Sequence, residues 1–146
     1  MKYQVGEVGR VVLARFEDGE DILENLSGIV RKEKISACIF YLLGGITDAR
    51  IVVGPADDLV RPPEPVWRQI AESHESLGIG TIFWYHDEPR IHFHGAFGKH
   101  DDVKAGCLRD EGKAFLVVEA VIVEISGVNA VRDLDSLTNM VLLKLL

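Results

Sequence analysis

Two histidines separated by one residue, His92 and His94, are the residues whose spacing points most directly to chemistry. On a β-strand, residues two apart face the same side and lie about 7 Å apart along the chain. Two imidazoles on one face of a strand can bind a common metal ion. The same pattern is also typical of a solvated strand face, so the histidine pair does not define a site by itself.

Cys107 supplies a third ligand type. It follows the histidines after a glycine-bearing polar stretch that is long enough to return the chain beside them. A thiolate and two imidazoles suit Zn²⁺, and three protein ligands with one open position are typical of catalytic zinc. We therefore predict that His92, His94 and Cys107 hold a divalent transition metal, with zinc as the first choice. The alternative is an exposed histidine pair and an unrelated loop thiol.

Glu119 is the candidate catalytic carboxylate, because it interrupts an apolar run and a buried acid needs a partner or stays protonated. It could accept a hydrogen bond from a ligand histidine or act as general base on a metal-bound water. The default interpretation is a structural ion pair with Arg109 or Arg132, within the chain or across a subunit contact. His74, His86 and His100 are weaker candidates, and Glu75 or His100 would be the residue to close a fourth metal position.

The elements that must position these residues begin with a strand over 9–17 and an amphipathic helix over 20–34, which Asp18 would cap. A buried strand over 35–43 follows, Gly44-Gly45 interrupts it, and a strand resumes over 48–53. Residues 54–65 hold four of the five prolines and are expected to form a loop. A short helix is expected over 66–71.

The histidines fall in a predicted hairpin of strands 79–86 and 91–97, joined by a turn over 87–90. Residues 98–113, which include Cys107, are expected to be loop or irregular strand. Long apolar strands are expected over 114–125 and 137–145. One early helix and many strands predict an α+β fold in a single domain over 1–146, with a largely antiparallel or mixed sheet and the helix on one face.

Composition narrows the function classes. The chain has 146 residues and a formal net charge of −7. A nucleic-acid binder needs a basic footprint, so we expect no nucleic-acid partner. We also expect no membrane contact and a cytoplasmic location, since no stretch approaches the roughly 20 apolar residues of a membrane span and the N-terminus has no signal core. Two cysteines in such a chain are more often free than bridged, and Cys38 reads as a small buried hydrophobe.

Several segments together resemble a known family. They are Arg15 to Leu23, Gly44-Gly45 with Asp48-Ala49, His74 to Ile82, Ile91 to Gly98, Gly106 to Arg109 and Val118 to Ile122. In these segments the chain resembles the PPC domain, the plants-and-prokaryotes domain, over nearly its whole length. Many members have histidine where this chain has Cys107, and either residue binds zinc.

The resemblance implies a homotrimer and a fold shared with acetolactate decarboxylase, whose metal is held by histidines. The chain lacks the R-G-R-P arm of the plant members and is acidic, so their link to DNA is not carried over.

Three functions stay open at this stage, and the sequence does not decide whether the protein is an enzyme. The first is a homotrimeric metal site with lyase- or hydrolase-like chemistry on a small, anionic organic acid. The second is a non-catalytic interaction or regulatory module in which the metal is structural. The third is a DNA-associated regulator, which the acidic charge disfavours.

Overall fold

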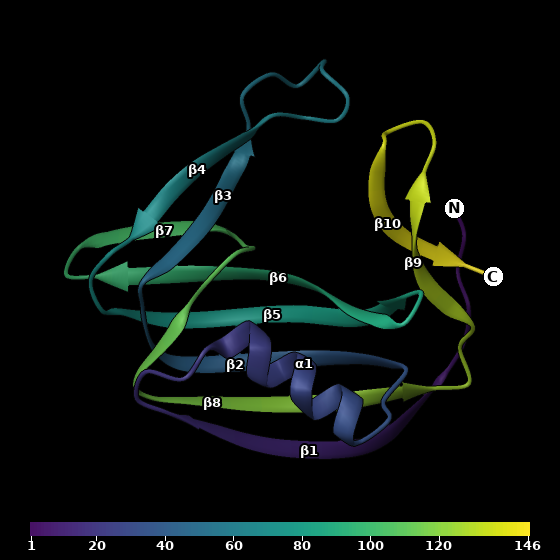
Figure 1. Cartoon of the computed structure of the whole chain (residues 1–146), viewed down its shortest axis with the longest axis horizontal. Helices are drawn as coiled ribbons and strands as arrows, with labels where there is room; N and C mark the ends of the chain where they lie inside the picture. The colour runs from purple at the N-terminus through teal and green to yellow at the C-terminus, as the bar shows by residue number, and fades with distance from the viewer.

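A computed structural model describes residues 1–146 as one eight-stranded sheet, one helix and one two-stranded ribbon (Figure 1). The sheet has the order β1-β8-β2-β5-β6-β7-β3-β4, and each pair of neighbours is antiparallel. Its strands are β1 (Glu7–Glu17), β2 (Ala37–Thr47), β3 (Ala49–Pro55), β4 (Pro65–Ile70), β5 (His74–Tyr85), β6 (Glu88–Lys99), β7 (Asp102–Leu108) and β8 (Lys113–Ser126). The ribbon pairs β9 (Ala130–Asp135) with β10 (Met140–Leu145).

One helix, α1 (Ile22–Lys32), covers one face of the sheet (Figure 1). Its apolar stripe of Ile22, Leu26 and Val30 is fully buried. The opposite sheet face, called the outer face below, has no helix over it. The expected helix is confirmed, but its N-cap is Asp21, whose side chain accepts from the Glu24 N–H at 2.8 Å. Asp18 is not the cap, because its carboxylate accepts instead from the Leu116 N–H at 2.7 Å.

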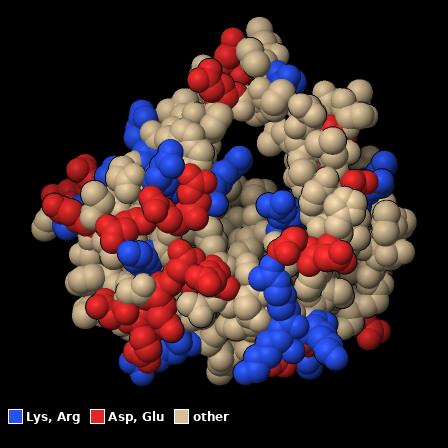
Figure 2. Space-filling view, in the orientation of Figure 1, with Lys and Arg blue, Asp and Glu red and all other residues tan.

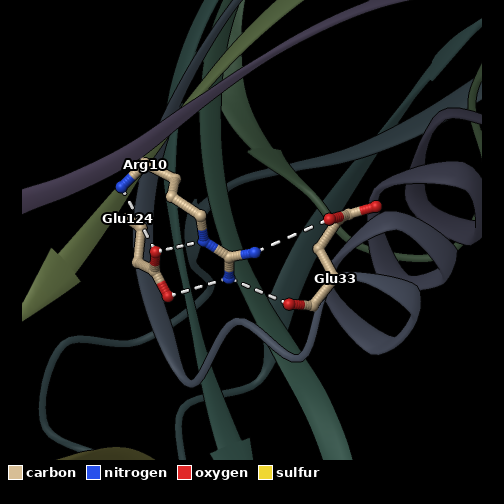
Figure 3. Close-up of polar contacts among 3 residues, drawn as sticks. All are labelled: Arg10, Glu33 and Glu124. Carbon is tan, nitrogen blue, oxygen red and sulfur yellow. Dashed lines mark hydrogen bonds and ion pairs between the residues drawn. The ribbon is translucent and has the colours of Figure 1, made fainter.

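Arg10 joins three elements at the other end of this helix (Figure 3). Its Nε donates to a Glu124 carboxylate oxygen at 2.8 Å, and its Nη2 donates to the Glu33 carbonyl at 2.9 Å. Glu33 is the C-cap of α1, and Glu124 lies on β8. The hydrogen bond from Arg10 holds the pKa of Glu124 below its usual range. Arg10 thereby ties the helix end to the β1–β8 edge of the sheet.

Aromatic rings from neighbouring strands fill the core between sheet and helix. Phe40 and Phe93 are fully buried and meet edge to face, with centroids 5.4 Å apart. Two glycines make this possible. A Cβ on Gly78 would lie 2.0 Å from Phe93 Cε2, and one on Gly80 would lie 2.3 Å from Phe40 Cζ. The glycine-bearing start of β5 therefore makes room for two phenyl rings.

The structure corrects the predicted elements at three places. Residues 66–71 were predicted as a helix, but β4 pairs there with β3, and Arg50 stacks over Trp67 at 4.4 Å. The stretch 98–113, predicted as loop or irregular strand, contains the regular strand β7. Gly44-Gly45 does not end a strand: β2 runs through both glycines, with a register shift there against β8.

The fold class is confirmed in its main parts, namely an antiparallel sheet with one helix on one face. The protein is richer in β-structure than the α+β term suggests, because α1 has only 11 residues and β9 was not expected. No helix has the length and hydropathy to cross a membrane.

Candidate metal centre

His92 and His94 lie on the outer face of β6. Phe93 between them is fully buried, and alternation along the strand sends both imidazoles the other way. Their Nε2 atoms are 2.9 Å apart, and the ring planes meet at 76°. The predicted placement of both rings on one face of a hairpin strand is confirmed.

Cys107 reaches the histidines through strand pairing. It lies on β7 directly opposite His94 in the antiparallel register. Directly opposed residues project to the same face with Cβ atoms about 5 Å apart. The thiol is nearly buried, with 6% of the residue exposed. The expected loop return is replaced by a strand, which holds the sulfur more rigidly than a loop would.

The three ligand atoms lie within 4.8 Å of one another. In a tetrahedral zinc site, two nitrogens lie about 3.4 Å apart and a nitrogen and a sulfur about 3.6 Å apart, given bond lengths of about 2.05 and 2.3 Å. To hold zinc, the two histidine nitrogens must therefore move slightly apart, and the cysteine sulfur must move closer to them by about 1 Å. Small side-chain rotations suffice, so this donor set fits zinc.

The electrostatic surroundings favour neutral histidine. Burial lowers the pKa of His92, and the charges of Arg132, His94 and Arg109 lower it further. A metal binds only the unprotonated ring nitrogen, so each of these effects keeps a lone pair available.

Glu119 is not brought to these ligands within one chain. It is exposed on the outer face of β8, opposite Leu43 of β2, and makes no ion pair. Three strand spacings of about 4.8 Å, or about 14 Å, separate its strand from β6. Neither Arg109 nor Arg132 contacts it, so the expected ion pair does not form in the chain.

The remaining histidines also lie elsewhere. His74 is buried, and its Nδ1 pairs with the Glu72 carbonyl at 2.7 Å. His86 and His100 occupy the tight turns before and after β6, with positive φ values of 52° and 53°. His86 therefore does not pair with a strand residue. Neither His100 nor Glu75 belongs to the cluster of ligand atoms, which has three members.

A cavity of about 410 Å³ opens beside the ligands. His94, Cys107 and Arg109 contribute to its wall from the main sheet, and Met140 contributes from the ribbon. Most of the rest comes from the β3–β4 hairpin, in the residues Val52, Val53, Gly54, Pro55, Pro63 and Pro65. Such a volume lies in the range of small-molecule sites. A small ligand therefore has space beside His94 and Cys107.

Arg132 is a residue near the site whose place sequence reasoning did not predict. It was considered only as a partner for Glu119, yet β9 brings it to the outer face beside β5, where Thr81 accepts from its Nη2 at 3.0 Å. An arginine in an alternating strand is ordinarily solvated, and no spacing rule relates residue 132 to residues 92 to 107.

Comparisons with known proteins agree on the fold. A family model described as the Plants and Prokaryotes Conserved (PCC) domain matches residues 3–126. No curated protein matches the sequence. A plant- and prokaryote-conserved protein from Pyrococcus horikoshii has a similar structure, with a TM-score of 0.86, 24% identity and coverage of 100% of this chain and 99% of that one.

Two further structures are similar. A metal-containing protein from Archaeoglobus fulgidus has a TM-score of 0.85 at 24% identity, covering 97% of this chain and 98% of that one. A proposed DNA-binding protein from Ralstonia eutropha has a TM-score of 0.74 at 21% identity, covering 91% and 90%. At these identities the likeness establishes the fold alone. The implied link to acetolactate decarboxylase receives no support from these findings.

Proposed function

The chain belongs to the Plants and Prokaryotes Conserved domain family, and on that premise we propose that it is a metal-binding protein in which His92, His94 and Cys107 hold zinc. The observation that carries the proposal is the convergence of three ligand atoms within 4.8 Å. The Archaeoglobus fulgidus relative is itself described as metal-containing. Two free cysteines, without a disulfide, fit the cytoplasmic location that forms part of the proposal.

We infer a catalytic rather than a structural type of site, because three protein ligands would leave a fourth position free, and a cavity lined by His94 and Cys107 lies beside them. Zinc held there would supply Lewis-acid polarisation of a carbonyl or activation of water. The residues of the chain would orient a small organic acid and exclude water with the apolar walls of the cavity. We propose lyase- or hydrolase-like chemistry of this kind.

The proposed assembly is a homotrimer. Its support is the apolar character of the outer face, where Leu13 is 78% exposed and Leu77 is 69% exposed. Tyr41 and Leu43 lie on β2, between the strands of Leu13 and Leu77, and Ile79 lies on β5 with Leu77; all three are also exposed. A contiguous apolar patch of this kind is typical of a protein interface. Since Glu119 lies on the same face but far from the ligands of its own chain, only a neighbouring copy could bring it to a metal.

Elemental analysis of protein purified without chelators tests the metal proposal. We expect about one zinc per chain in the wild type, loss of metal in Cys107→Ser, and retention in Cys107→His, because imidazole also binds zinc. Cys38→Ala is the matched control, since Cys38 is fully buried in the core and far from the ligand cluster. Metal-free wild-type protein, or equal metal in Cys107→Ser, would refute the proposal.

A non-catalytic module is the main alternative. A structural metal would make folding depend on it, so chelation would unfold the protein. We expect the chelated protein to stay folded, because the core of 20 buried residues lies on the helix side of the sheet, away from the ligands. Circular dichroism with and without chelator distinguishes the two.

DNA association is the third candidate. Two similar structures are described as proposed DNA-binding proteins, and this weighs against our expectation of no nucleic-acid partner. The net charge of −7 still disfavours phosphate binding. A fragment-shift assay near physiological salt tests this candidate: a salt-dependent shift would support a regulator, and no shift would contradict DNA association.

A further inference from the structure

Arg132 is a buried cation without an anion. The residue is 8% exposed, and its guanidinium carbon lies 5.8 Å from the centre of the Phe83 ring. Its side chain donates one hydrogen bond, to Thr81 Oγ1, and takes part in none of the ion pairs of the chain. Arginine has five N–H donors. No buried polar side-chain atom of the protein lacks a partner, so its free donors are those open to solvent.

The opening lies beside the metal ligands. Thr81, which anchors the guanidinium, is directly opposite His92 in the β5–β6 register. Directly opposed residues share a face, with Cβ atoms about 5 Å apart. The β9–β10 ribbon thus presents a guanidinium next to the first ligand, from residues beyond the 3–126 matched by the family model.

A second cation lies on the other side of the ligands. Arg109 follows directly after β7 and lines the cavity with His94 and Cys107. It too has no carboxylate partner within the chain, and no aspartate or glutamate lines the cavity. Figure 2 shows the hollow between the β3–β4 and β9–β10 hairpins, with Lys or Arg side chains on both of its sides. Arg132 lies outside the cavity wall and approaches the ligands from the His92 side, so the two cations flank the ligands and neither is neutralised by an acid of the chain.

We propose that Arg132, assisted by Arg109, binds the carboxylate of a small 2-hydroxy or 2-oxo acid at the metal centre. The inference rests on the proposed metal site and identifies its ligand class. A guanidinium pairs with a carboxylate through two parallel hydrogen bonds. The oxygen on the adjacent carbon of such an acid would then face the open metal position, and its alkyl part would meet apolar walls such as Val52, Pro55 and Met140.

Calorimetric titration of the zinc-loaded protein tests the inference with lactate as the probe. Lactamide has the same shape without the negative charge, and inorganic phosphate is an anion without an alkyl part. We expect saturable lactate binding, at least about tenfold weaker lactamide binding, and at least about tenfold weaker lactate binding by Arg132→Gln, because hydrogen bonds to a charged group are among the strong ones. Arg132→Lys should fall between, since it keeps the charge but loses the paired geometry.

Arg31→Gln is the control for loss of a positive charge, because Arg31 lies on α1 and pairs with Glu88. It should bind lactate as the wild type does. If Arg132→Gln does not fold, the inference is tested by Arg109→Gln and by comparing lactate with lactamide on the wild type.

The outcomes separate the two proposals. Zinc-loaded wild type that does not bind lactate, or binds lactate and lactamide equally, overturns the inference and leaves the metal site standing. Equal lactate affinity in folded Arg132→Gln overturns it as well, and phosphate binding tighter than lactate binding would replace the organic acid with a phosphate ligand. If the wild type holds no zinc in elemental analysis, the proposed metal function fails first.

Discussion

Gly78→Ala tests how the core positions the metal ligands. The added methyl would lie 2.0 Å from Phe93 Cε2 and 2.5 Å from Cζ, whereas ordinary contacts lie at 3.4–4 Å. The Phe93 ring must therefore retreat by about 1.4 Å. It has no free space to enter, because it is fully buried against Phe40. The strain passes to the backbone of β6, whose next residues on either side are His92 and His94.

The expected cost follows from overpacking. An extra methyl in a close-packed core costs about 1–3 kcal/mol, or about 3–9 °C in melting temperature at about 3 °C per kcal/mol for a chain of this size. Zinc affinity should fall by about tenfold, in the range seen when the support of a metal ligand is disturbed. Thermal denaturation of the chelated protein measures the first effect, and competition with a chromophoric chelator measures the second.

Gly98→Ala is the matched control on the neighbouring strand β6, which carries the histidines, because its Cβ would meet nothing closer than Val103 Cγ2 at 3.8 Å. It should keep both stability and zinc affinity. Adding Phe93→Leu to Gly78→Ala should recover part of the lost stability, since the smaller side chain vacates the contested space. If Gly78→Ala and Gly98→Ala have the same melting temperature, the packing argument is refuted. If Gly78→Ala is less stable but keeps the zinc affinity of the wild type, the link from Phe93 to the ligands is refuted.

Three further predictions concern single side chains. Burial raises the pKa of the Cys38 thiol to about 11. Alkylation of the native, chelated protein at pH 8 should therefore modify Cys107 alone, and bound zinc should block that modification. Mass spectrometry of the peptides measures the modification with and without zinc. Glu124 has a lowered pKa through its hydrogen bond from Arg10, so its contribution to stability is present above its unfolded pKa of about 4.3 and is lost as pH falls through the lower folded value. Glu124→Gln should then reduce the melting temperature more at pH 6 than at pH 3. Thr81→Val should weaken lactate binding while leaving zinc content unchanged, because it removes the anchor of the guanidinium; unchanged lactate affinity would contradict that role.

The alternation of side chains along a strand was enough to predict the placement of His92 and His94, two of the three proposed ligands. His92 and His94 flank an aromatic residue in a strand, so their common face follows from period-two geometry. The position of Cys107 did not follow in the same way, because Asp102, Lys104, Ala105 and Gly106 have weak intrinsic strand propensity. Pairing with β6 forms the strand nevertheless. On its other side Gly106 lets β3 approach, because a Cβ there would lie 2.5 Å from the Val52 carbonyl oxygen.

Long-range contacts explain the remaining errors. Residues 66–71 were assigned to a helix from local pattern, but Trp67 lies in β4, opposite Val52 of β3. Glu119 was expected to be buried because apolar residues flank it, yet a strand with one open face exposes every second residue. Arg132 acquires its place only when the ribbon packs against β5, and no pattern along the chain encodes that contact.

The open sheet face has a thermodynamic consequence for the proposed trimer. Tyr41, Leu77 and Ile79 line a hollow on that face that also includes His94. Copies that meet there would close over the edge of the metal centre. Zinc occupancy and subunit association would then be linked equilibria, each favouring the other by the same factor. Dilution of the protein would lower its affinity for the ion, and removal of the ion would weaken subunit association. Protein concentration would therefore regulate the occupancy of the metal site.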